Sequence, residues 1–356
     1  MKKEDLRHGV RIMLRECLGL IPGEDVVVLT DVPSYEYFSS KSGRELKLLQ
    51  LTNLLAVTVK ELAEEEFPRC SFSVFPFPYE AGEDFWQGEA LTQVQHANVV
   101  LALTNRSISH MPVCREMLKL GARIASMPGF LPDMLLENGP VMVDYATMET
   151  AGRKIEKALK QGSSARLTSP DGTDLLMDIS SRQVINGAER ISGKGAFGNI
   201  PIGEVFTSPK EGSAVGRLVV KARWYPGLDE DMIITFRDGA VSGLSGGGSV
   251  GRRFERLFEL TSDKPDAVAI ARRNCAELGV GLNPGADSVE SVLEAEKIWG
   301  TVHVAVGDNS GFGGVVSADI HQDLVIPWPT LTLDGIPLII SGEIVGVPKP
   351  IERKMT

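Results

Sequence analysis

The C-terminal third of the sequence carries two histidines in settings suited to metal binding. His303 lies in the apolar run TVHVAVG, and His321 stands two residues before Asp323 in SADIHQDLV. On an extended segment, residues two apart project to the same face, so His321 and Asp323 point the same way. Imidazole and carboxylate groups offer lone pairs to divalent cations at neutral pH. The pattern predicts a two-histidine, one-carboxylate site, although a single histidine on an apolar strand is more often a hydrogen-bonded core residue.

Two glutamates also lie in apolar surroundings. Glu204 stands in GNIPIGEVFTSP, and Glu277 stands in CAELGVGLNPG, at the predicted end of an apolar helix that begins in PDAVAIARRN. A charge in an apolar setting is costly unless it is paired or bound to a metal. An exposed side chain or a salt bridge is the alternative for each glutamate, and the residues alone leave both interpretations open.

An α/β domain is predicted over residues 1–160, which precede all of these candidate ligands in the sequence. Apolar residues at the spacing of one helix face begin it: Val10, Met13, Leu14, Cys17 and Leu18. The run at 26–29 and the segments HANVVLALTN and GARIASMPGF predict buried strands, with the helix-like HMPVCREMLKLG between the last two. This alternation favours a parallel, Rossmann-like sheet. Neither GxGxxG nor GxxxxGK[ST] follows these strands, so the sequence lacks the glycine signature of a nucleotide site.

An α+β metal-binding domain is predicted over residues 165–356. A polar stretch around KQGSSAR precedes a hairpin centred on SPDGTD. Strand signals then dominate in GRLVVKARW, DMIITFRDGAVSGL and PLIISGEIV. The glycine-rich SGLSGGGSVG at 242–251 is either a plain connection or a loop that gates a ligand.

Composition narrows the class of partner. The 356 residues carry a net charge of −10 without a dense Lys/Arg cluster, so we expect no nucleic-acid partner. No apolar run approaches the roughly 18 residues of a membrane span. The four cysteines form no CxxC pair, and the first residues lack the apolar run of a secretory leader. We therefore expect reduced thiols and a cytoplasmic location.

Four motifs taken in order carry a resemblance to a known family. They are GNIPIGEVFTSP, AELGVGLNPG, EKIWGTVHVAVGDN and IHQDLV. Together they resemble the metallo-aminopeptidases that include aminopeptidase T and aminopeptidase S, closely in the second domain and only in architecture in the first. The resemblance implies two divalent ions, zinc or cobalt, bridged by Glu277 and held by five ligands: Glu204, Glu277, His303, His321 and Asp323. It also implies a homodimer that hydrolyses the N-terminal amide bond of peptides with a metal-activated water.

The sequence departs from that family at two positions. Ser310 stands where the family has a tyrosine, and the family's glutamate before the first histidine is matched by Glu294 or Glu296 only with shifted spacing. We take Glu296 as the candidate general base, with a solvated helix charge as the alternative.

The same resemblance extends to 2,5-dihydroxypyridine dioxygenase, which implies a different chemistry. One non-haem Fe(II) needs only His303, His321 and Asp323, and leaves positions open for oxygen and an aromatic substrate. A catalytically silent protein that binds a small molecule is a third interpretation, but no ligand residue is lost. Because Glu204 and Glu277 are both present, the sequence favours the hydrolase, with the dioxygenase as the alternative.

Overall fold

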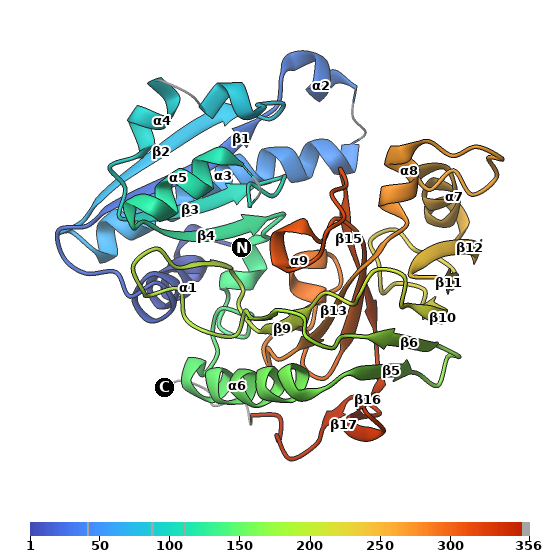
Figure 1. The fold of residues 1–356 in the computed structure, drawn as a ribbon. Coiled ribbons are helices and arrows are strands. Elements are labelled where there is room, and N and C mark those ends of the chain that lie inside the picture. The colour runs from blue at the N-terminus through green and yellow to red at the C-terminus, as the bar shows by residue number, and fades with distance from the viewer. Residues whose placement is uncertain (41–42, 87–88, 110, 351–356) are drawn as a thin grey trace. The chain divides into compact units, whose positions relative to one another are not determined.

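A computed structural model describes residues 1–350 of the chain, with gaps at 41–42, 87–88 and 110 (Figure 1). The chain divides into two compact units: unit 1 is Met1–Tyr145 with Arg190–Ile202, and unit 2 is Ala146–Glu189 with the chain from Gly203 onward. The sequence predicted domains over 1–160 and 165–356, and so assigned residues 190–202 to the second domain, whereas this segment belongs to unit 1. The two predicted ranges stay a prediction.

Unit 1 is built on a five-stranded parallel sheet in the order β2-β1-β3-β4-β8. Figure 1 labels β1, β2, β3 and β4 of this sheet. Its strands are β1 (Asp25–Val32), β2 (Ser71–Pro78), β3 (Val99–Thr104), β4 (Arg123–Pro128) and β8 (Phe197–Asn199). Helix α3 (Gly43–Glu66) contacts β1, β2 and β3. Helix α5 (Pro112–Leu120) packs in one apolar cluster with Val27 and Val100 of the strands. The predicted parallel sheet with helices is confirmed, and its three inner strands, β1, β3 and β4, are almost entirely buried, whereas the outer strands β2 and β8 are more exposed.

Further helical segments of unit 1 connect these strands. They are η1 (Lys3–Leu6), α1 (Arg7–Ile12), η2 (Met13–Cys17), α2 (Tyr35–Ser39), η3 (Glu83–Trp86), α4 (Glu89–Val94) and η4 (Pro132–Leu135). The apolar face predicted for the first helix is confirmed, since all of its residues are fully buried: Val10, Met13, Leu14, Cys17 and Leu18. Among the described residues, no helix combines the length and the apolar character needed to cross a bilayer.

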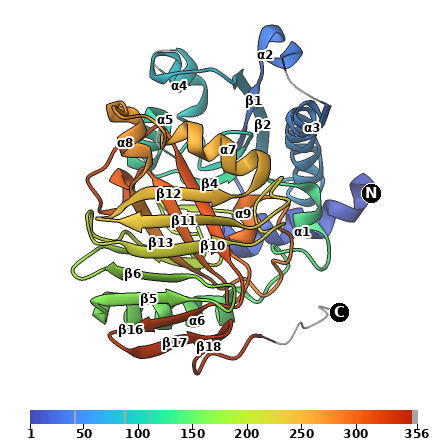
Figure 2. The same cartoon turned by 90° about the vertical axis from the view of Figure 1, so that its right-hand side faces the viewer.

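Unit 2 contains, within its described residues, two antiparallel sheets (Figure 2). The larger has the order β12-β11-β10-β6-β5-β16-β17-β18, and the smaller has the order β15-β14-β13-β9-β7. The strands are β5 (Ser164–Thr168), β6 (Asp174–Asp178), β7 (Val184–Asn186), β9 (Glu204–Thr207), β10 (Val215–Val220), β11 (Met232–Arg237), β12 (Ala240–Gly246), β13 (Cys275–Gly281), β14 (Val302–Gly307), β15 (His321–Ile326), β16 (Thr330–Leu333), β17 (Ile336–Ile340) and β18 (Glu343–Ile344). The helical segments are α6 (Tyr145–Gln161), α7 (Gly248–Leu257), α8 (Ala267–Arg272), α9 (Val292–Ala295) and η5 (Ser310–Phe312).

Local turns of unit 2 follow the sequence signals in two places. The predicted hairpin around SPDGTD is confirmed, because β5 and β6 pair antiparallel with Leu167 opposite Leu175. The glycine-rich segment at 242–251 is a strand-to-helix connection that ends β12 and begins α7. Its glycines at 246, 247 and 248 have φ values of 75°, 74° and 53°, a backbone region that glycine adopts without a steric cost.

The helix predicted from PDAVAIARRNCAELG is shorter than expected. Asp266 caps α8 by accepting the Ala269 N–H at 2.6 Å, and the helix ends at Arg272. From Cys275 the chain forms β13, in which every residue is buried. A short apolar run fits a buried strand as well as a buried helix, so its periodicity did not separate the two. The placement of Glu277 at the end of a helix was therefore wrong; it lies within a strand.

The burial of the parallel sheet predicts a large cost for truncating its central strand. Leu101 of β3 is fully buried, so Leu101→Ala leaves a cavity and should lower the free energy of unfolding by about 2–5 kcal/mol. Leu120→Ala is the matched control, because that side chain is 58% exposed and its loss should change stability by less than about 0.5 kcal/mol. Urea unfolding followed by circular dichroism measures both, and equal midpoints for the two variants would contradict the assigned burial.

Candidate metal centre

All five predicted metal ligands lie on one face of the smaller sheet of unit 2. Residues directly opposite one another on antiparallel strands share a face of the sheet. Glu277 of β13 lies opposite Ala305 of β14, which in turn lies opposite Asp323 of β15. His321 precedes Asp323 by two residues on the same strand and so points to the same side. The predicted common face of His321 and Asp323 is therefore present.

The other two ligands join this face beside glycines of β13. His303 lies opposite Gly279, and Glu204 of β9 lies opposite Gly281. A Cβ on Gly279 would lie 2.0 Å from His303 Nε2, so the imidazole fills the space that a side chain would need. Gly279 of the AELGVGLNPG motif thus makes room for the His303 imidazole.

A β-bulge decides which way Glu277 points. The register of β13 against β14 shifts between Cys275 and Glu277, so that Glu277 pairs with Ala305. Without this shift Glu277 would pair with Val304, which is fully buried on the opposite, apolar face. The extra residue of the bulge therefore turns the carboxylate toward the other ligands.

The two imidazoles converge on Glu277. His303 Nε2 lies 3.0 Å from Glu277 Oε1, and His321 Nε2 lies 3.3 Å from Glu277 Oε2. His321 Nε2 also lies 3.4 Å from Asp323 Oδ1, and His303 Nε2 lies 3.5 Å from Glu204 Oε2. The donor atoms form two triads whose members lie within 4.8 Å of one another: Glu204, Glu277 and His303 in the first, and Glu277, His321 and Asp323 in the second. The structure therefore brings all five predicted ligands together.

These buried groups shift one another's pKa. Burial alone would lower the pKa of both imidazoles, but the Glu277 carboxylate raises the pKa of His303 to about 9. Asp323 and Glu277 likewise raise the pKa of His321 against the effect of burial. Burial would raise the pKa of Glu277, yet its hydrogen bonds with both imidazoles leave that pKa below its usual value. A bound cation must displace the protons on Nε2, because only a neutral imidazole offers a free lone pair.

The two imidazoles are oriented by different means. His321 Nδ1 lies 2.7 Å from the backbone carbonyl of Asp308, so Nδ1–H donates there and Nε2 is left to face the ligands. His303 Nδ1 is buried without a hydrogen-bond partner among the described residues. Its ring is held instead by the close approach to Gly279.

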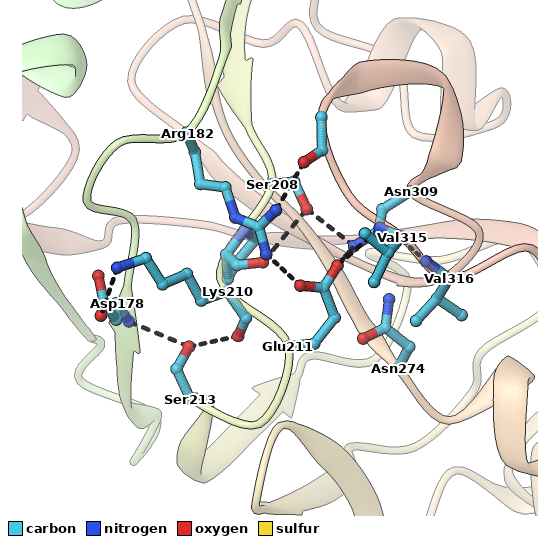
Figure 3. Close-up of polar contacts among 12 residues, drawn as sticks. Asp178, Arg182, Ser208, Lys210, Glu211, Ser213, Asn274, Asn309, Val315 and Val316 are labelled. Atoms are coloured by element: carbon cyan, nitrogen blue, oxygen red, sulfur yellow. Dashed lines mark hydrogen bonds and ion pairs between the residues drawn. The ribbon is translucent and has the colours of Figure 1, made fainter.

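A polar network holds the loop that supplies the carbonyl to His321 (Figure 3). Asn309 Nδ2 donates to Glu211 Oε1 at 3.0 Å. The same oxygen accepts the backbone N–H of Val315 at 2.9 Å, and the other Glu211 oxygen pairs with Arg182. Because Asn309 directly follows the residue whose carbonyl meets the imidazole, this network fixes the backbone that orients His321.

Glu296, the predicted general base, is buried beside the ligands. It caps the C-terminus of α9, contacts Lys297 Nζ and hydrogen-bonds Asp323. Burial raises the pKa of Glu296, Lys297 opposes that rise, and the carboxylates of Glu204 and Asp323 add to it. A solvated helix charge was the alternative interpretation, and a residue exposure of 8% rules it out.

Two further charged residues define the segment before His303. Glu294 accepts the backbone N–H groups of Asp287 and Ser288 at 3.1 and 3.2 Å, and so shapes a turn. Lys297 was not found by sequence reasoning. Its side chain is fully buried, with Nζ 3.2 Å from Glu204 Oε1. The sequence signal was weak: Lys297 precedes the apolar Ile298 and Trp299 in EAEKIWG. Its burial, and with it the need for a charged partner, is visible in the structure.

Comparisons with known proteins relate the chain to one family and two solved structures. The model of the NicX family, 2,5-dihydroxypyridine 5,6-dioxygenase, matches residues 11–346. The 2,5-dihydroxypyridine 5,6-dioxygenase of Pseudomonas putida KT2440 is 24% identical over 269 residues, which cover 69% of this chain and 71% of that protein.

The two structures share the fold over nearly the whole chain. The structure of 2,5-dihydroxypyridine dioxygenase from Pseudomonas putida KT2440 has a TM-score of 0.72 at 19% identity, and covers 97% of this chain and 98% of that chain. Wild-type AmpT from Thermus thermophilus has a TM-score of 0.60 at 17% identity, and covers 96% of this chain and 99% of that chain.

The close approach at Gly279 predicts a loss of metal affinity when a side chain is added. Gly279→Ala should displace the His303 imidazole and weaken Zn²⁺ binding by about 10–100-fold, the range typical of residues that orient a ligand. Gly243→Ala is the control, because a Cβ there lies 3.8 Å from its nearest neighbour, an ordinary contact. Calorimetric titration with Zn²⁺ measures the affinity, and an unchanged value for Gly279→Ala would show that His303 has no role in binding.

The loop network predicts that a charge at position 309 will act on His321 from a distance. Asn309→Asp sets a second carboxylate against Glu211, so the loop should detach and Zn²⁺ affinity should fall by about tenfold. Hydrogen exchange at the Val315 amide should become faster at the same time.

Asn98→Asp is the control for this variant. Asn98 is exposed in unit 1, and a carboxylate there can still accept the Asp25 N–H that the amide oxygen now accepts at 2.8 Å. If Asn309→Asp kept the wild-type Zn²⁺ affinity and the wild-type rate of hydrogen exchange at Val315, the network would have no role in supporting the metal centre.

Proposed function

This chain belongs to the NicX family, 2,5-dihydroxypyridine 5,6-dioxygenase, and on that premise we propose that it is a ring-cleaving dioxygenase that uses one non-haem Fe(II). The proposed substrate is 2,5-dihydroxypyridine or a closely similar dihydroxylated ring. The observation that carries the proposal is the family match over residues 11–346, which include every candidate ligand.

The aminopeptidase favoured by the sequence was wrong, and the family match overturns it. Hydrolase, protease and metalloprotease activity, a peptide substrate and the general-base role of Glu296 in hydrolysis fall with it. The pair of zinc or cobalt ions was inferred from the same resemblance and has no support from this family. The dioxygenase, which was the stated alternative, takes its place. The homodimer and the cytoplasmic location stay predictions.

The donor set in unit 2 fits a ferrous ion. Two imidazole nitrogens and a carboxylate are the common set in such oxygenases, and the sequence suggested His303, His321 and Asp323 for it. In the structure, however, the triad that contains both His321 and Asp323 is completed by Glu277, so these three residues would hold the ion. His303 belongs to the other triad, lies over Gly279 and contacts Glu277 from the other side. A ferrous ion held there would supply open coordination positions for oxygen and for the hydroxyl groups of the substrate.

Several residues of the chain would prepare this centre. The Asp308 carbonyl keeps a proton on His321 Nδ1, which leaves Nε2 to bind. Strand register places both imidazoles on one face of the sheet, and Glu277 lies between them and contacts the Nε2 atom of each. Glu296 hydrogen-bonds Asp323 and so would fix the direction of that ligand.

An aromatic side chain beside the centre favours a flat substrate. Phe312, on the loop after β14, packs edge to face against His321 with ring centroids 5.6 Å apart. It also packs edge to face against Phe206, with centroids 5.4 Å apart. An aromatic wall next to a metal ligand stacks favourably on a planar ring. In the proposed reaction the ring opens between two carbons, both atoms of O₂ enter the product, and the ring supplies the electrons that O₂ accepts.

Oxygen uptake with a defined metal load tests the function. The chain loaded anaerobically with Fe(II) should hold about one iron and consume about one O₂ per 2,5-dihydroxypyridine. His321→Ala should lower the rate by more than about 100-fold, beyond the effect of a residue that only orients a ligand. His96→Ala is the control, because His96 is exposed in unit 1 and its loss should leave the rate unchanged. The proposal fails if the iron-loaded chain consumes no oxygen with this substrate.

A further inference from the structure

Lys297 places a permanent positive charge inside the metal centre. Its side chain has no exposed surface, Nζ contacts Glu296, and Nζ lies 3.2 Å from Glu204 Oε1. A buried ammonium is stable only beside carboxylates that compensate its charge, and both partners here are themselves buried. The ammonium is therefore a built component of the centre.

The backbone holds Lys297 at this place. Its N–H donates to the carbonyl of Glu294 at 3.0 Å, and its carbonyl accepts the N–H of Asn283 at 2.8 Å. With the main chain fixed on both sides and the side chain enclosed by protein, the charge stays next to Glu204.

The two triads of donor atoms meet this charge differently. Lys297 Nζ pairs directly with Glu204 of the first triad, whereas it is linked to Asp323 of the second triad only through Glu296, and Asp323 lies 3.4 Å from His321. Like charges in a buried site repel one another strongly, because little water screens them. A divalent ion at the first triad would lie beside the ammonium, so the second triad is the better position for a metal.

We propose that the Lys297 ammonium takes the place of a second metal ion, so that the centre holds a single divalent cation on the side of His321 and Asp323. Two triads that share one carboxylate are the arrangement that a pair of bridged ions requires. Here the chain itself supplies one of the two positive charges, and Glu204 is the partner of Lys297 instead of a metal ligand. This inference rests on the metal centre of the proposed function but not on its ring substrate.

Zinc stoichiometry tests the proposal without reference to catalysis. Metal-free wild type, Lys297→Gln and Lys297→Arg are titrated with Zn²⁺ by calorimetry, and the gel-filtered proteins are analysed for zinc. The wild type and Lys297→Arg, which keeps the cation, should bind one Zn²⁺ per chain. Lys297→Gln should bind two, because Glu204 and Glu296 then lack a cation.

A second pair of variants keeps the test independent of whether Lys297→Gln folds. If Glu204 serves Lys297, Glu204→Gln should retain Zn²⁺ affinity within about tenfold of the wild type. Asp323→Asn is the matched control, because it removes a ligand of the second triad and should lower the affinity by more than about 100-fold.

Three results would overturn the inference. They are two Zn²⁺ ions in the wild type, one Zn²⁺ in a Lys297→Gln protein whose circular dichroism matches the wild type, and equal losses of affinity in Glu204→Gln and Asp323→Asn. A wild type that binds one Zn²⁺ but, with iron, consumes no oxygen in the presence of 2,5-dihydroxypyridine would sink the proposed function and leave this inference standing.

Discussion

The arrangement of the metal centre depends on the Glu277 carboxylate, on which two imidazoles from different strands converge. Its two oxygens lie 3.0 and 3.3 Å from the Nε2 atoms of His303 and His321. A carboxylate in this buried position carries a desolvation cost that only such partners offset. The bulge that turns Glu277 to this face and the glycine opposite His303 both serve the same convergence. Backbone irregularity and missing side chains are thus as much a part of the site as the ligands.

Much of the fold and the identity of the ligands could be predicted from the sequence. Apolar runs such as VVLALT specify strands buried on both faces, and the two-residue spacing of His321 and Asp323 specifies a shared face once the segment is extended. These predictions succeed because they depend on residues close together in the chain. The α/β arrangement of the first part and the position of His303 within a strand follow from the same kind of local signal.

The rest of the site depends on contacts between distant segments, which local patterns do not specify. The bulge beside Glu277 arises from the pairing of β13 with β14, a strand about 30 residues further along the chain. The sequence of neither strand contains a local signal for it. The choice of chemistry failed for a related reason. Glu204 was counted as a metal ligand and so favoured a two-metal hydrolase, but it also pairs with Lys297, 93 positions away in the printed sequence. A salt bridge was the alternative that the residues had left open for Glu204, and only the tertiary fold identifies its partner.

The loop between β14 and β15 both orients His321, through the Asp308 carbonyl, and carries Phe312 beside the metal centre. Glu211 accepts a hydrogen bond from the Val315 backbone N–H of this loop, while the Val315 side chain is 80% exposed. Exposed side chains such as Val315 can therefore vary without loss of this contact, because Glu211 binds the Val315 main chain. Asn309 cannot vary in the same way, since its side-chain amide donates to the same Glu211 oxygen. Protein engineering or natural divergence can therefore change the surface next to Phe312 to suit a different ring substrate, while the orientation of the His321 imidazole is preserved.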